Sequence, residues 1–343
     1  MVQPERRWAA LMRAILHVGF PKTGTTSIQA YCSRNTTALR EHGILYPETG
    51  RKLWFKDRKR HIGFAMACEV PDQPPSAAMK SYGLTTARAR QRFTRTFLRR
   101  LDREIARNRD AAVAVFSDEG LSSFRDPRML QFIHDQMTAR FDSVTIVCML
   151  REPAGYLASA YSQYIKMGGV ETWQMFKEKR LSTTLFLDRI ATWQDIFGRD
   201  QVLTRVLQRD AVAQFQELLG LPPATDSAER ENPSLSRFGL DLLRAVNAEY
   251  KRLGKTRPAS VRQAFAAHLT GPGLKASVAE SGQIYHACAD EIAGLVARCD
   301  LPEADLVYIS EYWQPRSRTT DAAPGAALAE EQLAAMLAKL FSR

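Results

Sequence analysis

A short glycine-containing segment near the N-terminus carries the residue types that bind phosphate. It reads GFPKTGTTS from Gly19 to Ser27 and follows an apolar run. Backbone N–H groups of such a turn and the positive end of the next helix attract an anion, and hydroxyl donors come from Thr25, Thr26 and Ser27. In the ATP-binding pattern the lysine follows the second glycine, whereas here Lys22 precedes Gly24. The segment therefore predicts an anion site whose lysine lies inside the loop and reaches an oxygen of the bound group.

A second pair of anion-binding residues follows another apolar run. Val144–Leu150 is succeeded by Arg151, and Pro153 suits the first turn of a helix. Ser159 stands eight residues after the arginine. An arginine and a hydroxyl that both face the crevice outside the strand ends would suit a second, separate phosphate. Taken alone this spacing is a weak pattern, for which a plain surface arginine is the default interpretation.

Together the two elements resemble those of the sulfotransferases that use PAPS, 3′-phosphoadenosine-5′-phosphosulfate. In that family a P-K-[ST]-G-T-T loop binds the 5′-phosphosulfate, and an arginine with a serine eight residues later binds the 3′-phosphate. Pro21–Thr26 matches the loop, and Arg151 with Ser159 matches the pair. The resemblance covers roughly residues 14 to 240. It implies that the chain binds PAPS and releases PAP, with loop contacts from Lys22, Thr23, Gly24, Thr25, Thr26 and Ser27.

Two further segments bear on the branch of that family. Asn232–Ser236, NPSLS, is similar to an N-x-S-L-S segment of bacterial members. The K-G-x-x-G-D-W signature of the hormone and phenol enzymes is absent, and Gly271–Lys275 is no convincing substitute. The resemblance thus implies a bacterial-type enzyme that sulfates a hydroxyl or amine of a glycan, a lipid, a peptide or a small metabolite.

The resemblance also gives the loop lysine a chemical role. Sulfuryl transfer places negative charge on the oxygen that bridges sulfur and the 5′-phosphate, and a cation beside that oxygen stabilises the leaving group. This scheme requires no divalent metal. None is expected from the sequence either, because the histidines form no ligand spacing and no Walker-type aspartate pairs with the loop.

An acceptor hydroxyl needs a general base, which the family places near the end of the strand preceding the arginine strand. Here that segment is VFSDEGLS, from Val115 to Ser122. Glu119 is the first candidate, and Asp118 is the neighbour that could replace it. The structural alternative is a Glu119 that caps the turn. His61, at the start of an apolar helix-like segment, is the second candidate, with a structural histidine as its alternative.

The elements that must position these residues alternate between strands and helices. Continuous apolar runs predict strands of a buried parallel sheet at Ala14–Val18, Ala111–Phe116, Val144–Leu150 and Gln201–Leu207. Helical patterns fill the gaps at Thr25 to about Arg40, Thr86–Asn108, Pro127–Arg140, Pro153–Lys166, Leu185–Phe197 and Ala211–Leu219. We expect an α/β fold in one domain, 1–343, whose central parallel sheet is flanked by helices. A PAPS-binding core is expected at 14–221 and a mainly helical extension at 222–343, which ends in an amphipathic segment at Ala326–Phe341.

The positive charge is concentrated in two segments. The 343 residues carry a net charge of +11, while 88–109 contributes +7 and 51–60 contributes +5, so the remainder is close to neutral. Within 88–109 an apolar residue recurs every fourth position, which leaves the arginines on the other faces of a helix. A solvated face is one interpretation. An anionic acceptor, such as an acidic glycan, a lipid headgroup or a membrane surface, is the sharper one.

Composition and missing patterns set aside other classes of protein. Apolar residues make up 45% of the chain and charged residues 25%, as in soluble globular proteins, and no apolar run is long enough to span a membrane. The absence of a secretory pattern and five scattered cysteines predict a cytoplasmic protein with reduced thiols, which could lie at a membrane surface. A P-loop kinase would carry its lysine where Thr25 stands, and a nucleic-acid-binding protein would interleave aromatic and basic residues. The acceptor and the oligomeric state stay open.

Overall fold

The computed structural model describes residues 12–53, 56–57, 59–70, 72–181, 186–208, 210–222 and 234–315. The amphipathic segment predicted at 326–341 and the first two residues of the NPSLS motif lie outside them. The described residues form two compact units. One unit contains those up to Leu150 together with 187–228 and 297–302, and the other contains 151–186, 229–296 and those from 303 onward.

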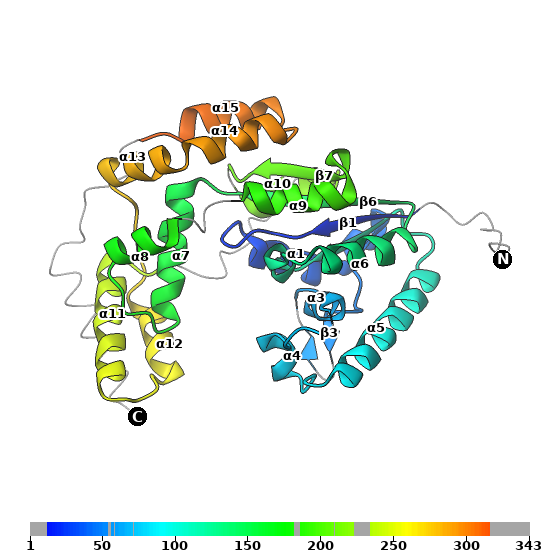
Figure 1. Ribbon diagram of the computed structural model, residues 1–343, viewed down its shortest axis with the longest axis horizontal. Coiled ribbons are helices and arrows are strands. Elements are labelled where there is room, and N and C mark those ends of the chain that lie inside the picture. The colour runs from blue at the N-terminus through cyan, green and yellow to red at the C-terminus, as the bar shows by residue number, and fades with distance from the viewer. Residues whose placement is uncertain are drawn as a thin grey trace. The chain divides into compact units, whose positions relative to one another are not determined.

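The first unit is built on a five-stranded parallel sheet with strand order β2-β5-β1-β6-β7 (Figure 1). Its strands are β1 (Arg13–His17), β2 (Ile44–Leu45), β5 (Val113–Ser117), β6 (Ser143–Leu150) and β7 (Val202–Val206). A short antiparallel ladder joins β3 (Lys52–Leu53) to β4 (Lys56–Asp57). The four strands expected from apolar runs are present with ends within two residues of those predicted. The predicted α/β class with a central parallel sheet is confirmed.

Helices connect the strands of this unit and cover both faces of the sheet. They are α1 (Thr25–Arg34), α2 (Thr36–Glu41), α3 (Ile62–Cys68), α4 (Ala77–Ser81), α5 (Ala87–Arg107), α6 (Pro127–Thr138), α9 (Leu187–Phe197) and α10 (Ala211–Leu218), with 3-10 turns η1 (Glu119–Ser123) and η3 (Arg199–Gln201). Alternate side chains of a strand point to opposite faces. On one face Ile15 packs with Ile28 of α1 and Phe215 of α10. On the other, Phe116 contacts Phe64 of α3.

The helix predicted from Thr25 to about Arg40 is interrupted. Asn35 separates α1 from α2, with a φ of −107° that no longer continues the helix. Its side-chain Nδ2 donates to the carbonyl of Tyr31 at 2.8 Å, and its backbone N–H donates to the same carbonyl at 3.0 Å. Asparagine competes in this way for backbone partners, which explains the break.

The described residues of the second unit form helices joined by loops. Its helices are α7 (Pro153–Lys166), α8 (Trp173–Arg180), α11 (Arg237–Arg252), α12 (Ala259–His268), α13 (Val278–Ala287), α14 (Ala289–Arg298, whose last two residues group with the first unit) and α15 (Glu303–Tyr312). Asn247 of α11 donates to the carbonyls of Ile165 and Gly169, both at 2.8 Å. The mainly helical C-terminal part was predicted, whereas the grouping of α7 and α8 with it was not.

The described part of the NPSLS motif contacts the chain at Thr270 and Gly271, where the segment Gly271–Lys275 begins. Leu235 forms an antiparallel bridge with Thr270, and the N–H of Gly271 donates to the carbonyl of Ser234 at 3.1 Å. Ser236 caps α11 by accepting from the N–H of Gly239 at 3.0 Å. These contacts give the described part of the NPSLS motif a structural role.

All five cysteines are buried and free, as their apolar neighbours predicted. In the part of the chain that the structure describes, no helix combines the length and apolarity needed to cross a membrane.

Candidate functional site

The predicted phosphate loop joins β1 to α1 through an unusual backbone. Gly19 and Gly24 have φ values of 30° and 80°, and Lys22 has a φ of 69°. Lys22 is the only residue other than glycine with a positive φ among the described residues. A side chain held in this region costs roughly 1–3 kcal/mol, and such residues gather at functional sites. The unusual backbone therefore falls at the position where the sequence pattern places the loop lysine.

Tight packing holds the loop in this conformation. Thr23 is fully buried, and its Oγ1 donates to the carbonyl of Phe20 at 2.6 Å. A Cβ added to Gly24 would collide with the Cβ of Ala211, the first residue of α10. Glycine is thus required here both by the positive φ and by the approach of α10.

The N-terminus of α1 lacks a side-chain cap. Gly24 is its N-cap and supplies no side-chain hydrogen bond, in contrast to Thr86 of α5 and Asp210 of α10, whose side chains accept from first-turn amides. The first-turn N–H groups of a helix need partners, and the helix dipole favours an anionic one. Residues Thr25 to Ser27 supply this turn, and their role in binding an anion stays a prediction.

The sheet brings Glu119 beside this loop. β5 pairs with β1 so that Ser117 lies opposite His17, and the segments that follow both strands are neighbours. Thr25 Oγ1 donates to Glu119 Oε2 at 3.1 Å. Arg60 Nη1 donates to the other carboxylate oxygen, Oε1, at 3.0 Å. Two residues predicted separately, one in the loop and one as the base, are therefore in direct contact.

Asp118 and Glu119 lie in very different settings. The side chain of Asp118 is 1% exposed, and its Oδ1 accepts from the N–H of Gly120 at 2.8 Å, which caps η1. Burial raises the pKa of Asp118 to about 6. The side chain of Glu119 is 35% exposed. Only Glu119 of this pair is open to a reacting group, while Asp118 has the capping role that the sequence left as an alternative for its neighbour.

His61 lies inside the core. Its Nδ1 accepts from the N–H of Ser117 at 3.0 Å, and its Nε2 lies 2.9 Å from the carbonyl of Pro47, to which it donates. Burial, with the positive charge of Arg51, lowers the pKa of His61 to about 3. The side chain has no exposed surface and both nitrogens are engaged. This setting favours the structural role of His61 over the role of a base.

A buried chain of hydrogen bonds behind Glu119 was not predicted. Gln29 Nε2 lies 3.5 Å from Glu119 Oε2 and 3.3 Å from Ser117 Oγ, donating to both. Ser117 Oγ lies 2.8 Å from His17 Nδ1, and burial lowers the pKa of His17 to about 4. The sequence contained one indication of this chain. Gln29 follows Thr25 by four residues, so the two side chains share a face of the helix. No local pattern marks Arg60, His17 or Ser117.

Arg151 and Ser159 belong to the second unit. Arg151 directly precedes Glu152, the N-cap of α7, and Ser159 is half-buried in the second turn of that helix. Glu152 accepts from the N–H of Gly155 at 2.9 Å and from the hydroxyl of Tyr285 at 2.6 Å. The start of α7 is therefore firmly held. The role of Arg151 and Ser159 in binding a second phosphate stays a prediction.

Within the described residues, no three histidine, cysteine, aspartate or glutamate side chains are grouped as a metal site. No protein-family model matches the chain, and no curated protein matches its sequence.

Similarity to known proteins is found among solved structures. At 17% identity and a TM-score of 0.42, the chain is similar to a sulfotransferase from Alicyclobacillus acidocaldarius, with 84% of this chain and 96% of that one covered. At 12% identity and a TM-score of 0.32, it is similar to the sulfotransferase domain from the curacin biosynthetic pathway, with 64% and 76% covered. Both structures are sulfotransferases, at levels of similarity that by themselves assign no function to this chain.

Proposed function

We propose that this chain transfers the sulfuryl group of PAPS to a hydroxyl or amine of an acceptor, releasing PAP. The observation that carries the proposal is the 3.1 Å hydrogen bond from Thr25 to Glu119, which joins the expected donor loop to the expected base. The positive φ of Lys22 supports it, since strain of this kind gathers at functional sites. The proposed enzyme is cytoplasmic and requires no metal.

The proposed reaction divides the work between two residues. The acceptor oxygen attacks sulfur, and the bond from sulfur to the 5′-phosphate oxygen breaks. The acceptor proton passes to Glu119, and the negative charge that develops on the phosphate oxygen is stabilised by Lys22. Arg60 donates to the Oε1 oxygen of Glu119 at 3.0 Å and so orients the carboxylate, leaving Oε2 to receive the proton.

The hydroxyl of Thr25 links the two halves of this scheme. It carries one hydrogen, which in this structure is donated to Glu119 Oε2. A phosphosulfate bound at the N-terminus of α1 would compete for the same hydrogen, because a charged acceptor at that site is favoured by the helix dipole. Binding of the donor would then leave Oε2 with only the longer 3.5 Å contact from Gln29, so that it can take up the acceptor proton.

The remaining donor contacts follow from the resemblance. We assign the 3′-phosphate to Arg151 and Ser159, and the 5′-phosphosulfate to Lys22 and the residues from Thr23 to Ser27. Arginine suits a phosphate because its guanidinium can donate two parallel hydrogen bonds. The half-buried positions of Arg151 and Ser159 leave part of each side chain accessible to a ligand.

The proposal is tested with sulfur-labelled PAPS and the purified protein. Polysaccharide, lipid and peptide fractions are offered as acceptors, with a chelator present throughout. We expect labelled product in at least one fraction, and calorimetry should detect binding of PAP. A protein that binds ATP and magnesium in preference to PAP would instead support the kinase alternative and overturn the proposal.

A further inference from the structure

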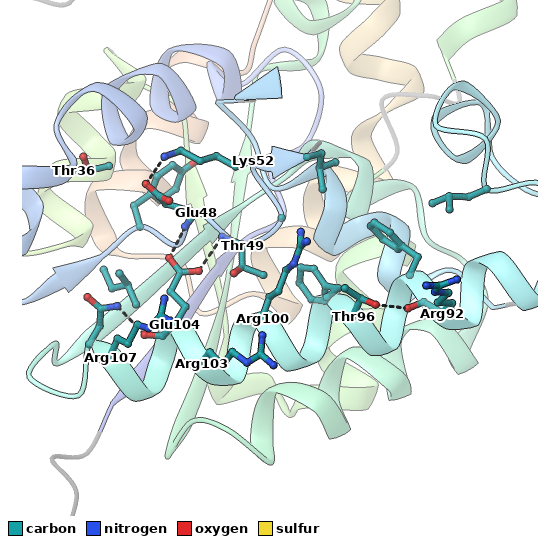
Figure 2. A pocket seen from close by; sticks show the side chains of 18 of the residues that line it. Thr36, Glu48, Thr49, Lys52, Arg92, Thr96, Arg100, Arg103, Glu104 and Arg107 are labelled. Atoms are coloured by element: carbon teal, nitrogen blue, oxygen red, sulfur yellow. Dashed lines mark hydrogen bonds and ion pairs between the residues drawn. The ribbon is translucent and has the colours of Figure 1, made fainter. Parts of the chain in front are cut away.

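A groove beside α5 is not used by the proposed reaction. It has a volume of about 950 Å³, within the usual range for ligand sites. One wall is α5, and the opposite wall comes from the segment between Thr36 and Leu53 (Figure 2). Both walls belong to the first unit.

The carboxylates of this groove are already engaged within the protein. Glu104 accepts from the backbone N–H groups of Glu48 and Thr49 at 2.7 and 2.9 Å, as Figure 2 shows. Glu48 in turn pairs with Lys52. The acidic side chains therefore hold the wall opposite α5 in place and are not available to bind a cation from outside.

Four arginines of the groove have no such partner. Arg92, Arg100, Arg103 and Arg107 line it and are exposed, and their guanidinium groups form no ion pair or hydrogen bond with other described residues. Arg90, on the same helix, is buried and donates to the carbonyl of Gln73 at 2.7 Å. From Arg92 to Arg107 the helix rises by about 22 Å. The groove thus presents unpaired positive charge along a line of that length.

The other lining residues reduce the classes of ligand that the groove could bind. Hydroxyl side chains at Thr36, Thr49 and Thr96 and the amide of Asn108 also line the groove. Single-stranded nucleic acid needs exposed aromatic rings for stacking. Of the three rings that line the groove, Phe97 and Tyr46 are buried, and Phe93 is half-buried because it packs against an apolar cluster. A membrane surface needs exposed apolar side chains beside the cations. The large exposed apolar residues of the described chain all lie beyond residue 166, outside this groove.

We propose that the groove beside α5 binds a linear acidic oligosaccharide. Its sulfate or carboxylate groups would pair with the four arginines, and its hydroxyls would exchange hydrogen bonds with the threonines and Asn108. Such binding does not depend on sulfuryl transfer.

The experiment measures binding without PAPS, so its outcome is separate from that of the transfer reaction. The probes are a heparin tetrasaccharide and an oligogalacturonate of equal length, and a neutral cellulose tetramer is the comparison. We expect both acidic chains to bind and the neutral one not to bind. Replacing Arg92, Arg100 and Arg103 together by glutamine should weaken this binding at least about tenfold, because charge-assisted hydrogen bonds are lost.

The same helix supplies a matched control. Arg88, Arg95 and Arg99 do not line the groove, and replacing these three by glutamine removes the same charge. Their variant should keep most of the affinity. Equal loss in the two variants would show attraction by overall charge and overturn the proposal. Tighter binding of a decathymidine, a polyglutamate peptide or phosphatidylglycerol vesicles than of either acidic saccharide would also overturn it.

Discussion

Two regions of the first unit use arginine in opposite ways. Beside the phosphate loop, Arg60 donates to Glu119 at 3.0 Å and lies 3.7 Å from Asp118, so its charge is satisfied within the protein. Along α5 the four arginines of the groove have no carboxylate partner among the described residues. A cation paired inside the protein fixes the position of its partner, whereas an exposed unpaired one gains most from an external anion.

The two sets of arginine contacts suit different tasks, since one positions a carboxylate of the protein and the other can bind an external anion. Thr25, Gln29 and Arg60 converge on one carboxylate, and each side chain limits the freedom of the others. Such a closed network orients a reacting group before the substrate arrives. The groove offers charge along a line but no comparable network. Variants near the loop should therefore change turnover, and variants of the groove should change affinity.

The largest effect on turnover is expected for Glu119→Gln. Glutamine keeps the size of the side chain and can still pair with Thr25, but it cannot take up the acceptor proton. We expect turnover to fall by about two to four orders of magnitude. Affinity for PAP should stay near that of the wild type, which calorimetry would check.

Asp118→Asn is the matched control for Glu119, since it makes the same chemical change one residue earlier. The amide oxygen of the new side chain would still accept from Gly120, and turnover should be largely retained because Asp118 is buried. If Asp118→Asn abolished transfer while Glu119→Gln did not, the base would be Asp118.

The second prediction concerns Lys22. Lys22→Ala removes the cation beside the leaving oxygen while the backbone donors of α1 remain. Sulfuryl transfer should fall by about a hundredfold or more. Binding of PAP should weaken only modestly. Lys22→Arg retains the charge and should recover part of the rate. Unchanged turnover in the alanine variant would contradict a role for Lys22 in the reaction.

The third prediction moves to the second unit and affects binding rather than chemistry. Arg151→Ala or Ser159→Ala should weaken binding of 3′,5′-ADP by about tenfold or more, because a charge-assisted hydrogen bond is removed. Binding of 5′-AMP, which lacks the 3′-phosphate, should change little. Calorimetry on both nucleotides distinguishes the cases, and equal losses for the two ligands would refute the assignment.

The sequence predicted the parts of the site that are local and missed those that depend on pairing between strands. The loop from Gly19 to Ser27 and the strand before it are contiguous, so their form could be read from residue types. The contact between Thr25 and Glu119 depends on β5 lying beside β1, which no local pattern specifies. The two residues of β2 are too few to show a strand period. The contact of Arg60 with Glu119 could not be predicted either, because in the sequence Arg60 is one of several basic residues in the segment 51–60.

The last prediction has the smallest effect and tests the position of His61. The folded pKa of about 3 lies below the ordinary value of 6.5, so the unfolded chain binds a proton that the folded chain does not. This histidine's stabilising effect is present in full above the ordinary pKa and is lost as the pH falls towards the folded one. At about pH 5 the loss in the free energy of unfolding should be on the order of 2 kcal/mol.

His61→Gln can keep both hydrogen bonds without titrating, so urea unfolding should show a smaller loss of this free energy between about pH 7.5 and pH 5 than in the wild type. The exposed His42→Gln should leave the difference unchanged. A folded His61→Gln protein without transferase activity would instead assign the base to His61.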